Sequence, residues 1–292
     1  RDAGKILLIG STGLLAESRQ ALGATKTKSS PQSSTQRTSP ATGMGARADN
    51  KNSKAEWSDV FVAEGPEPTI SYRTGWVVYE ETLINGQFGG RGWNGAGYIN
   101  YYDARIIPGE HRMPEAFRLE IDGQLLLTDW KWGGLKKTSS ADGSTHVTVT
   151  LINEVRPVTV VVHTKLDGTA ILTRWLEVTN TSKQPAALAT VSPWSGVMRK
   201  NDDWQEHLKR TDLPLYSIGY FENTTWGHEG NFQWHDMPHA RYNVDGRYRR
   251  DRYRHPIFML RNNATGEFFI GQLAWTGGYS FGFDLNTELK GN

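Results

Sequence analysis

Several acidic side chains late in the chain are of the type that hydrolyses glycosidic bonds. In that chemistry two carboxyl groups stand at a set separation, one as acid and the other as nucleophile or base. The candidates are Asp202, Asp203, Glu206 and Glu229. None of them follows a recognisable barrel strand, so we expect solvated loop residues and assign no catalytic residue.

Three histidines suggest metal binding. His228, His235 and His239 fall within one loop-like stretch, beside Glu229 and Asp236. A zinc site needs three or four ligands that converge from defined elements. Here the spacing is irregular and no strand or helix pattern fixes it. We therefore expect a loop of hydrogen-bonded polar side chains, with no metal and no cofactor.

Tryptophan is the strongest compositional signal, with 11 residues in the chain. An indole ring stacks on the apolar face of a sugar, while neighbouring polar groups bind the hydroxyls. Tryptophan also fills wide β-sandwich cores, and for any single residue both interpretations stay open. Trp93, in a glycine-rich stretch, and Trp194 are our candidates for sugar contact.

Arginine and tyrosine alternate over Arg241–Arg254. Such a stretch can bind nucleic acid or an anionic sugar. It is also typical of an exposed edge strand, where charged side chains resist aggregation. We favour the edge strand.

The charge of the chain is unevenly distributed. Over 292 residues the formal net charge is +2, yet residues 1–54 hold nine basic and three acidic side chains and no aromatic ring. The remainder is net acidic, which argues against a nucleic-acid surface on the body. The absence of cysteine excludes disulfides, cysteine-bound zinc and thiol nucleophiles. No run of 18 apolar residues occurs, so we expect no membrane partner.

The first 54 residues differ in texture from the rest. Lys5–Ala16 fits a Rossmann first strand with its glycine turn, a worn signal peptide with Ala21–Ala24 as its cleavage region, or an unstructured leader. The signal interpretation favours a secreted or periplasmic location. Residues 25–54 are rich in Ser, Thr and Pro and lack apolar periodicity. We expect residues 1–54 to be disordered and residues 55–292 to form the folded body. Arg1 suggests a piece of a longer reading frame.

From Trp57 onward the pattern predicts an all-β body. Asp122-Gly123, Asp142-Gly143 and Asp167-Gly168 separate short runs rich in β-branched and aromatic residues, as in hairpins. Helical patterns are absent, and the strand spacing favours one large antiparallel β-sandwich. The residues expected in or near its core are Leu119, Ile121, Val147, Val149, Val160, Val162, Leu172, Leu176 and Phe269.

Four stretches of the body carry a family resemblance. They are His111–Phe117 with Asp122-Gly123, then Thr173–Asn180, then Tyr220-Phe221 with Trp226 and Glu229, and finally His255–Leu260 with Gly266-Glu267 and Leu273–Gly278. In this order they resemble the N-terminal domain of glycoside hydrolase family 36, the α-galactosidases. The resemblance covers residues 57–285. The first stretch departs from the family pattern by one extra residue before Ala116.

The resemblance implies a β-supersandwich that precedes a catalytic (β/α)₈ barrel, whose two Asp residues hydrolyse terminal α-galactosides with retention. This sequence reaches Asn292 without βαβ alternation, so we expect the catalytic residues to be missing. In the family, loops of this domain border the active site. By the match to the family motif, the resemblance implies that Arg112 contacts the substrate. Glu110 aligns with an Asp of that motif and so departs from the family pattern.

Three hypotheses follow for the function. The first is the non-catalytic domain of an α-galactosidase-like hydrolase, with an α-galactoside substrate, a missing C-terminal barrel as partner and a homo-oligomeric full-length protein. The second is a stand-alone carbohydrate-binding or lectin-like module. The third is a structural sandwich of another sugar-active enzyme. The expected substrate-binding residues are Arg112, Trp93, Glu110 and Trp194.

Overall fold

The computed structural model describes part of the chain. The described residues are 8–10, 58–94, 114–198, 214–222, 227, 230–238, 240–247, 253–264, 266–275 and 277–285. All of them belong to one compact unit, which comprises Arg1–Leu14 and Lys54–Asn292.

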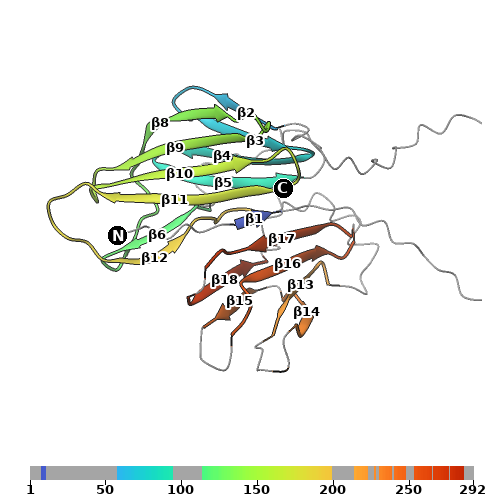
Figure 1. Cartoon of the computed structure of the whole chain (residues 1–292). Helices are drawn as coiled ribbons and strands as arrows, with labels where there is room; N and C mark the ends of the chain where they lie inside the picture. Colours follow the sequence, from blue (N-terminus) through green and yellow to red (C-terminus); the bar gives the residue numbers. More distant parts are fainter. Residues whose placement is uncertain are drawn as a thin grey trace, which may run out of the picture. The chain divides into compact units, whose positions relative to one another are not determined.

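The first two-thirds of the body form three antiparallel sheets. One sheet follows chain order: β2 (Ser58–Ala63), β3 (Thr69–Thr74), β4 (Val77–Ile84) and β5 (Gln87–Asn94). The second has the order β1–β11–β10–β9–β8, with β8 (Trp130–Ser139), β9 (Thr145–Asn153), β10 (Val158–Leu166) and β11 (Leu172–Asn180) (Figure 1). The third has the order β12–β6–β7, with β6 (Arg118–Ile121), β7 (Gln124–Leu125) and β12 (Leu188–Ser192).

Strand β1 (Leu8–Gly10) lies within the segment that we expected to lack structure. It pairs antiparallel with β11, with Leu8 opposite Arg174 and Gly10 opposite Leu172. This pairing contradicts the Rossmann interpretation, which requires the strand to sit in a parallel sheet. The other residues of 1–57 lie outside the described part of the chain, so the disordered leader and the boundary at residue 54 stay predictions.

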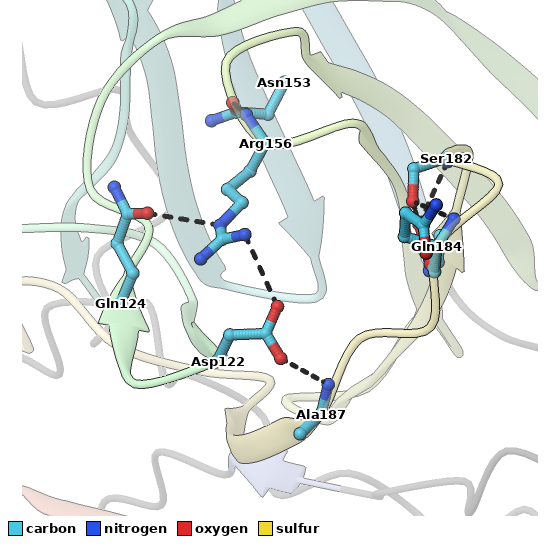
Figure 2. A network of polar contacts seen from close by, with 8 residues as sticks. Asp122, Gln124, Asn153, Arg156, Ser182, Gln184 and Ala187 are labelled. Carbon is cyan, nitrogen blue, oxygen red and sulfur yellow. Dashed lines mark hydrogen bonds and ion pairs between the residues drawn. The ribbon is translucent and has the colours of Figure 1, made fainter.

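The Asp122-Gly123 hairpin forms as predicted between β6 and β7. Both residues have positive φ, 50° and 76°, as the favoured two-residue hairpin turn requires. The Asp122 carboxylate also accepts a hydrogen bond from the Ala187 amide at 2.7 Å and pairs with Arg156 at 3.4 Å. Arg156 in turn donates to Gln124 (Figure 2). The hairpin is thereby tied both to the turn after β9 and to the segment before β12.

These three sheets share one hydrophobic core. The predicted core positions from Leu119 to Leu176 are all buried, between 0% and 7% exposed. Phe269 is partly buried and packs against this core and against a second one. The core prediction is therefore confirmed. It could be made from the sequence because strict alternation shows which face of each strand is apolar.

The second core lies in the last third of the chain. A four-stranded sheet has the order β14–β13–β16–β17, formed by β13 (Tyr216–Phe221), β14 (Phe232–Asp236), β16 (Ile257–Asn262) and β17 (Phe268–Gln272). Strands β15 (Arg241–Gly246) and β18 (Tyr279–Asp284) form a two-stranded sheet. Within the described residues β15 pairs with β18 alone, which agrees with the edge strand favoured for the start of Arg241–Arg254.

The all-β prediction is confirmed for the described residues, whose regular elements are all strands and whose sheets are all antiparallel. The single large sandwich is not what they form, since the strands are divided among five sheets. The strands are divided in this way because the apolar side chains form two cores instead of one. No described residues form a helix long and apolar enough to cross a membrane.

Candidate functional site

A fully buried ion pair joins two of the sheets. Glu81 of β4 and Arg174 of β11 are both 0% exposed, and Nη2 of Arg174 lies 2.5 Å from Oε1 of Glu81. Alternation places Arg174 on the same face as the buried Leu172 and Leu176, and Glu81 on the same face as the buried Tyr79. A charge on an apolar face needs a counter-charge, which each residue provides for the other.

Two tyrosines complete the bonding of this carboxylate. The Tyr79 hydroxyl donates to Oε1 of Glu81 at 3.0 Å, and the Tyr72 hydroxyl donates to Oε2 at 2.8 Å. Burial, reinforced by the negative Glu81, raises the pKa of both phenols well above 10. Burial lowers the pKa of Arg174, but Glu81 together with Tyr79 and Tyr72 outweighs this effect, and the pKa is raised. The cluster is therefore a charged pair held by two neutral phenols.

Aromatic rings enclose the guanidinium. Arg174 lies 4.8 Å from the ring centroid of Trp194 and 5.7 Å from that of Tyr79. Its Nε and Nη1 atoms are buried, and among the described residues none accepts a hydrogen bond of ordinary geometry from either atom. Cation–π attraction takes the place of those hydrogen bonds. We call Tyr72, Tyr79, Glu81, Trp93, Arg174 and Trp194 the Glu81 cluster.

The structure brings together two of the four predicted substrate-binding residues, Trp93 and Trp194. Their ring centroids are 4.8 Å apart, and Tyr79 lies 4.4 Å from Trp93 and 5.1 Å from Trp194. Trp93 is only 6% exposed, and Phe269 packs edge-on against it at 5.1 Å. The exposed sugar-stacking face that we expected at Trp93 is absent, because neighbouring rings cover it. Glu110 and Arg112 lie outside the described residues.

Close backbone packing positions Trp194. The amide of Ser195 donates to the carbonyl of Ala116 at 2.9 Å, and the amide of Val197 donates to that of Gly90 at 3.1 Å. Gly196 has a φ of 109°, and a Cβ there would lie 2.9 Å from the Cα of Gly90. Two glycines thus allow this segment to lie against β5 and to bring Trp194 onto Trp93.

A second polar cluster surrounds the predicted residue His235. Its Nε2 lies 3.0 Å from Oε1 of Glu222, and Arg254 lies 3.2 Å from the other oxygen of the same carboxylate. The Tyr220 ring stacks on His235 at 4.7 Å, with Arg254 over the ring at 4.9 Å. The Glu222 carboxylate therefore contacts one cation and one imidazole.

A pair of histidines occupies the five-stranded sheet. His146 Nε2 and His163 Nδ1 are 3.0 Å apart, and the Trp175 ring stacks on both at 5.2 Å and 4.7 Å. Glu177 lies 3.3 Å from His163 Nε2. Burial, aided by His163 and Lys165, lowers the pKa of His146 below 6.5. This shift favours the uncharged form of His146 near neutral pH.

The metal and carboxylate candidates of the sequence fall mostly outside the described residues. This holds for His228, His239, Asp202, Asp203, Glu206 and Glu229. Within the described ranges no three or more His, Asp or Glu side chains form a group that could hold a metal.

The sequence patterns missed Glu81, Arg174 and Tyr72. A signal was present, because Leu172, Arg174 and Leu176 alternate in one strand and put a charge on its apolar face. The identity of the partner was not predictable, since Glu81 lies in a different sheet.

The comparisons with known proteins concern the fold. No protein-family profile and no curated protein sequence matches the chain. Its structure is similar to that of the glycoside hydrolase family 36 α-galactosidase AgaB from Geobacillus stearothermophilus, with a TM-score of 0.46 and 11% identity over 76% of this chain and 40% of that one. The same values hold for the galactosidase domain of the α-galactosidase–sucrose kinase AgaSK. The chain spans about 40% of the length of these two chains, and such a likeness assigns neither family nor activity.

Proposed function

We propose that this chain is the non-catalytic β domain of an α-galactosidase-like glycoside hydrolase that acts on terminal α-galactosides. The observation that carries the proposal is that the carboxylate of the Glu81 cluster is not accessible to a substrate. A hydrolytic carboxylate must reach its substrate and exchange a proton with it. Glu81 is 0% exposed, and both of its oxygens are occupied by Arg174 and the two tyrosines. Its charge therefore serves to join two sheets.

The family-like stretches of the sequence support the same role. Ala116 and Phe117 of the first stretch lie in the first core, and Phe258 and Leu260 of the fourth lie in the second. The second stretch coincides with β11 and supplies Arg174. Residues that carry the resemblance thus build the interior of the domain, as expected when the resemblance reflects a shared fold.

The proposal extends to predicted substrate-binding residues. In the whole protein, Arg112, Glu110 and Trp194 border an active site whose nucleophile and acid are supplied by a barrel. The β domain supports that barrel, and the full-length protein assembles as a homo-oligomer. No metal or cofactor takes part in this chemistry.

A turnover assay tests the proposal. The purified chain is incubated with an aryl α-galactoside, with a complete family 36 α-galactosidase as the positive control. We expect no release of galactose above background from the chain alone. Turnover that is lost on Asp203→Asn or Glu229→Gln would instead show that these residues catalyse the reaction, and would contradict a non-catalytic role.

A further inference from the structure

The sheet β14–β13–β16–β17 has one face outside the second core. Its inward residues are Tyr216, Ile218, Tyr220, Phe258 and Leu260, all buried. Strand alternation places the intervening residues on the opposite face. The register brings Trp234 opposite Gly219, and Arg261 opposite both Ser217 and Phe268.

Aromatic rings form a continuous row along this region. The consecutive centroid distances are 4.6 Å from Tyr253 to His255, 4.8 Å to Phe221, 5.2 Å to Phe232, 5.5 Å to Trp234 and 6.0 Å to Phe268. We call these six residues the aromatic strip. None of them is buried, and Tyr253 and Trp234 are 38% and 37% exposed. Six adjacent, partly exposed rings form a contiguous apolar patch, and such patches mark interaction sites, whereas single exposed apolar residues do not.

The strip is held in place by the sheet beneath it. Gly219 leaves room for the rings, because a Cβ at that position would lie 2.5 Å from Phe232 and 3.0 Å from Trp234. Most of the neighbouring rings meet edge to face, which is a favourable arrangement. Rings fixed before a ligand arrives lose little conformational freedom on binding.

Polar groups line one side of the strip. The Arg261 guanidinium lies 4.7 Å from the Trp234 ring centroid, and its Nε donates to Asn263 Oδ1 at 2.8 Å. Asn263 donates to Ser217, which in turn donates to Asp236 at 3.4 Å. The rim thus offers an amide, a carboxylate and a guanidinium without a large excess of either charge, while the buried Ser217 hydroxyl links two of them.

We propose that the aromatic strip binds an oligosaccharide chain. Sugar rings combine apolar C–H faces with hydroxyl groups, which matches exposed aromatic rings beside a mixed donor and acceptor rim. A single row of rings suits a linear chain better than a broad protein interface with a dry core. The choice of a carbohydrate ligand rests on the proposed function, but the strip includes none of the four predicted substrate-binding residues.

Affinity electrophoresis of the whole chain in gels containing soluble galactomannan tests the site. We expect the polysaccharide to retard the wild type, and Trp234→Ala to weaken binding about tenfold, the equivalent of about 1.4 kcal/mol. Tyr253→Ala should weaken it as well, whereas Trp234→Phe, which keeps a ring, should retain part of it. The matched control is Trp76→Ala, which removes a 69% exposed indole outside the strip and should leave binding unchanged.

Two results would overturn the inference. One is equal retardation of the wild type and Trp234→Ala, or no retardation of the wild type. The other is a loss of self-association in Trp234→Ala, measured by sedimentation, while polysaccharide binding stays unchanged; that result would make the strip a contact between copies of the chain. Circular dichroism of each variant verifies that it is folded. The turnover assay is independent, so failure at the strip leaves the proposed domain role standing.

Discussion

Removing one charge of the Glu81–Arg174 pair leaves the other buried without a counter-charge. We therefore expect Glu81→Gln to lower the free energy of unfolding by about 3–5 kcal/mol. The double variant Glu81→Leu/Arg174→Leu should lose less than the sum of the two single leucine variants, because no uncompensated charge remains. Denaturant unfolding of the wild type and the four variants measures both quantities.

An exposed ion pair provides the control. The side chains of Lys131 and Glu154 are 63% and 65% exposed, so Glu154→Gln should change the unfolding free energy by less than about 1 kcal/mol. A loss for Glu81→Gln no larger than this would show that the buried pair does not hold the sheets together.

His146 makes the stability of the fold depend on pH. Its pKa in the folded state is below its ordinary value of 6.5, so the unfolded chain binds the proton more readily. Stability from this group is complete above the unfolded-state pKa of 6.5 and is lost as the pH falls from there through the lower pKa of the folded state. Unfolding curves recorded on both sides of pH 6.5 should show a shallower decline for His146→Gln than for the wild type. Identical slopes would show that His146 does not cause the dependence.

At the scale of elements, the contact of the segment around Trp194 with β5 depends on Gly196. Gly196→Ala should cost about 1–3 kcal/mol more than Gly134→Ala, because its methyl group would meet Gly90. Gly134 is a matched control, since its φ is 120° against 109° and nothing lies within 4 Å of its Cβ position. Both variants have an alanine at a positive φ, which is strained, but only Gly196→Ala also has a clash with Gly90. Equal losses in denaturant unfolding would refute the close approach.

The sequence predicted the elements better than the sites. Leu119 and Ile121 alternate beside an Asp-Gly turn, so their strand, their face and their hairpin followed from local pattern. The burial of Trp93 did not follow, because it depends on rings from Tyr79, Trp194 and Phe269, which no local pattern brings together. For the same reason the sequence could not show that the apolar positions divide between two cores.

At the scale of the whole molecule, strand β1 covers the edge of β11. Removal of residues 1–14 should leave β11 as an exposed edge, with unpaired backbone groups available to solvent or to another chain. Within residues 172–174, which pair with β1 on one side and β10 on the other, we expect the amides that point toward β1 to exchange with solvent faster in the shortened chain. The amides of residues 147–149 lie between β8 and β10 and should be unaffected. Unchanged exchange at residues 172–174 would contradict the pairing.

The proximity of Trp93 and Trp194 also has an optical consequence. Two indoles whose centroids are 4.8 Å apart, with planes inclined by 33°, are close enough for their electronic transitions to couple. Coupled transitions of this kind produce a pair of circular dichroism bands of opposite sign, which neither isolated indole shows. The signal should vanish when either tryptophan is replaced by phenylalanine. It therefore provides an intrinsic optical reporter of whether the segment that carries Trp194 is docked on β5.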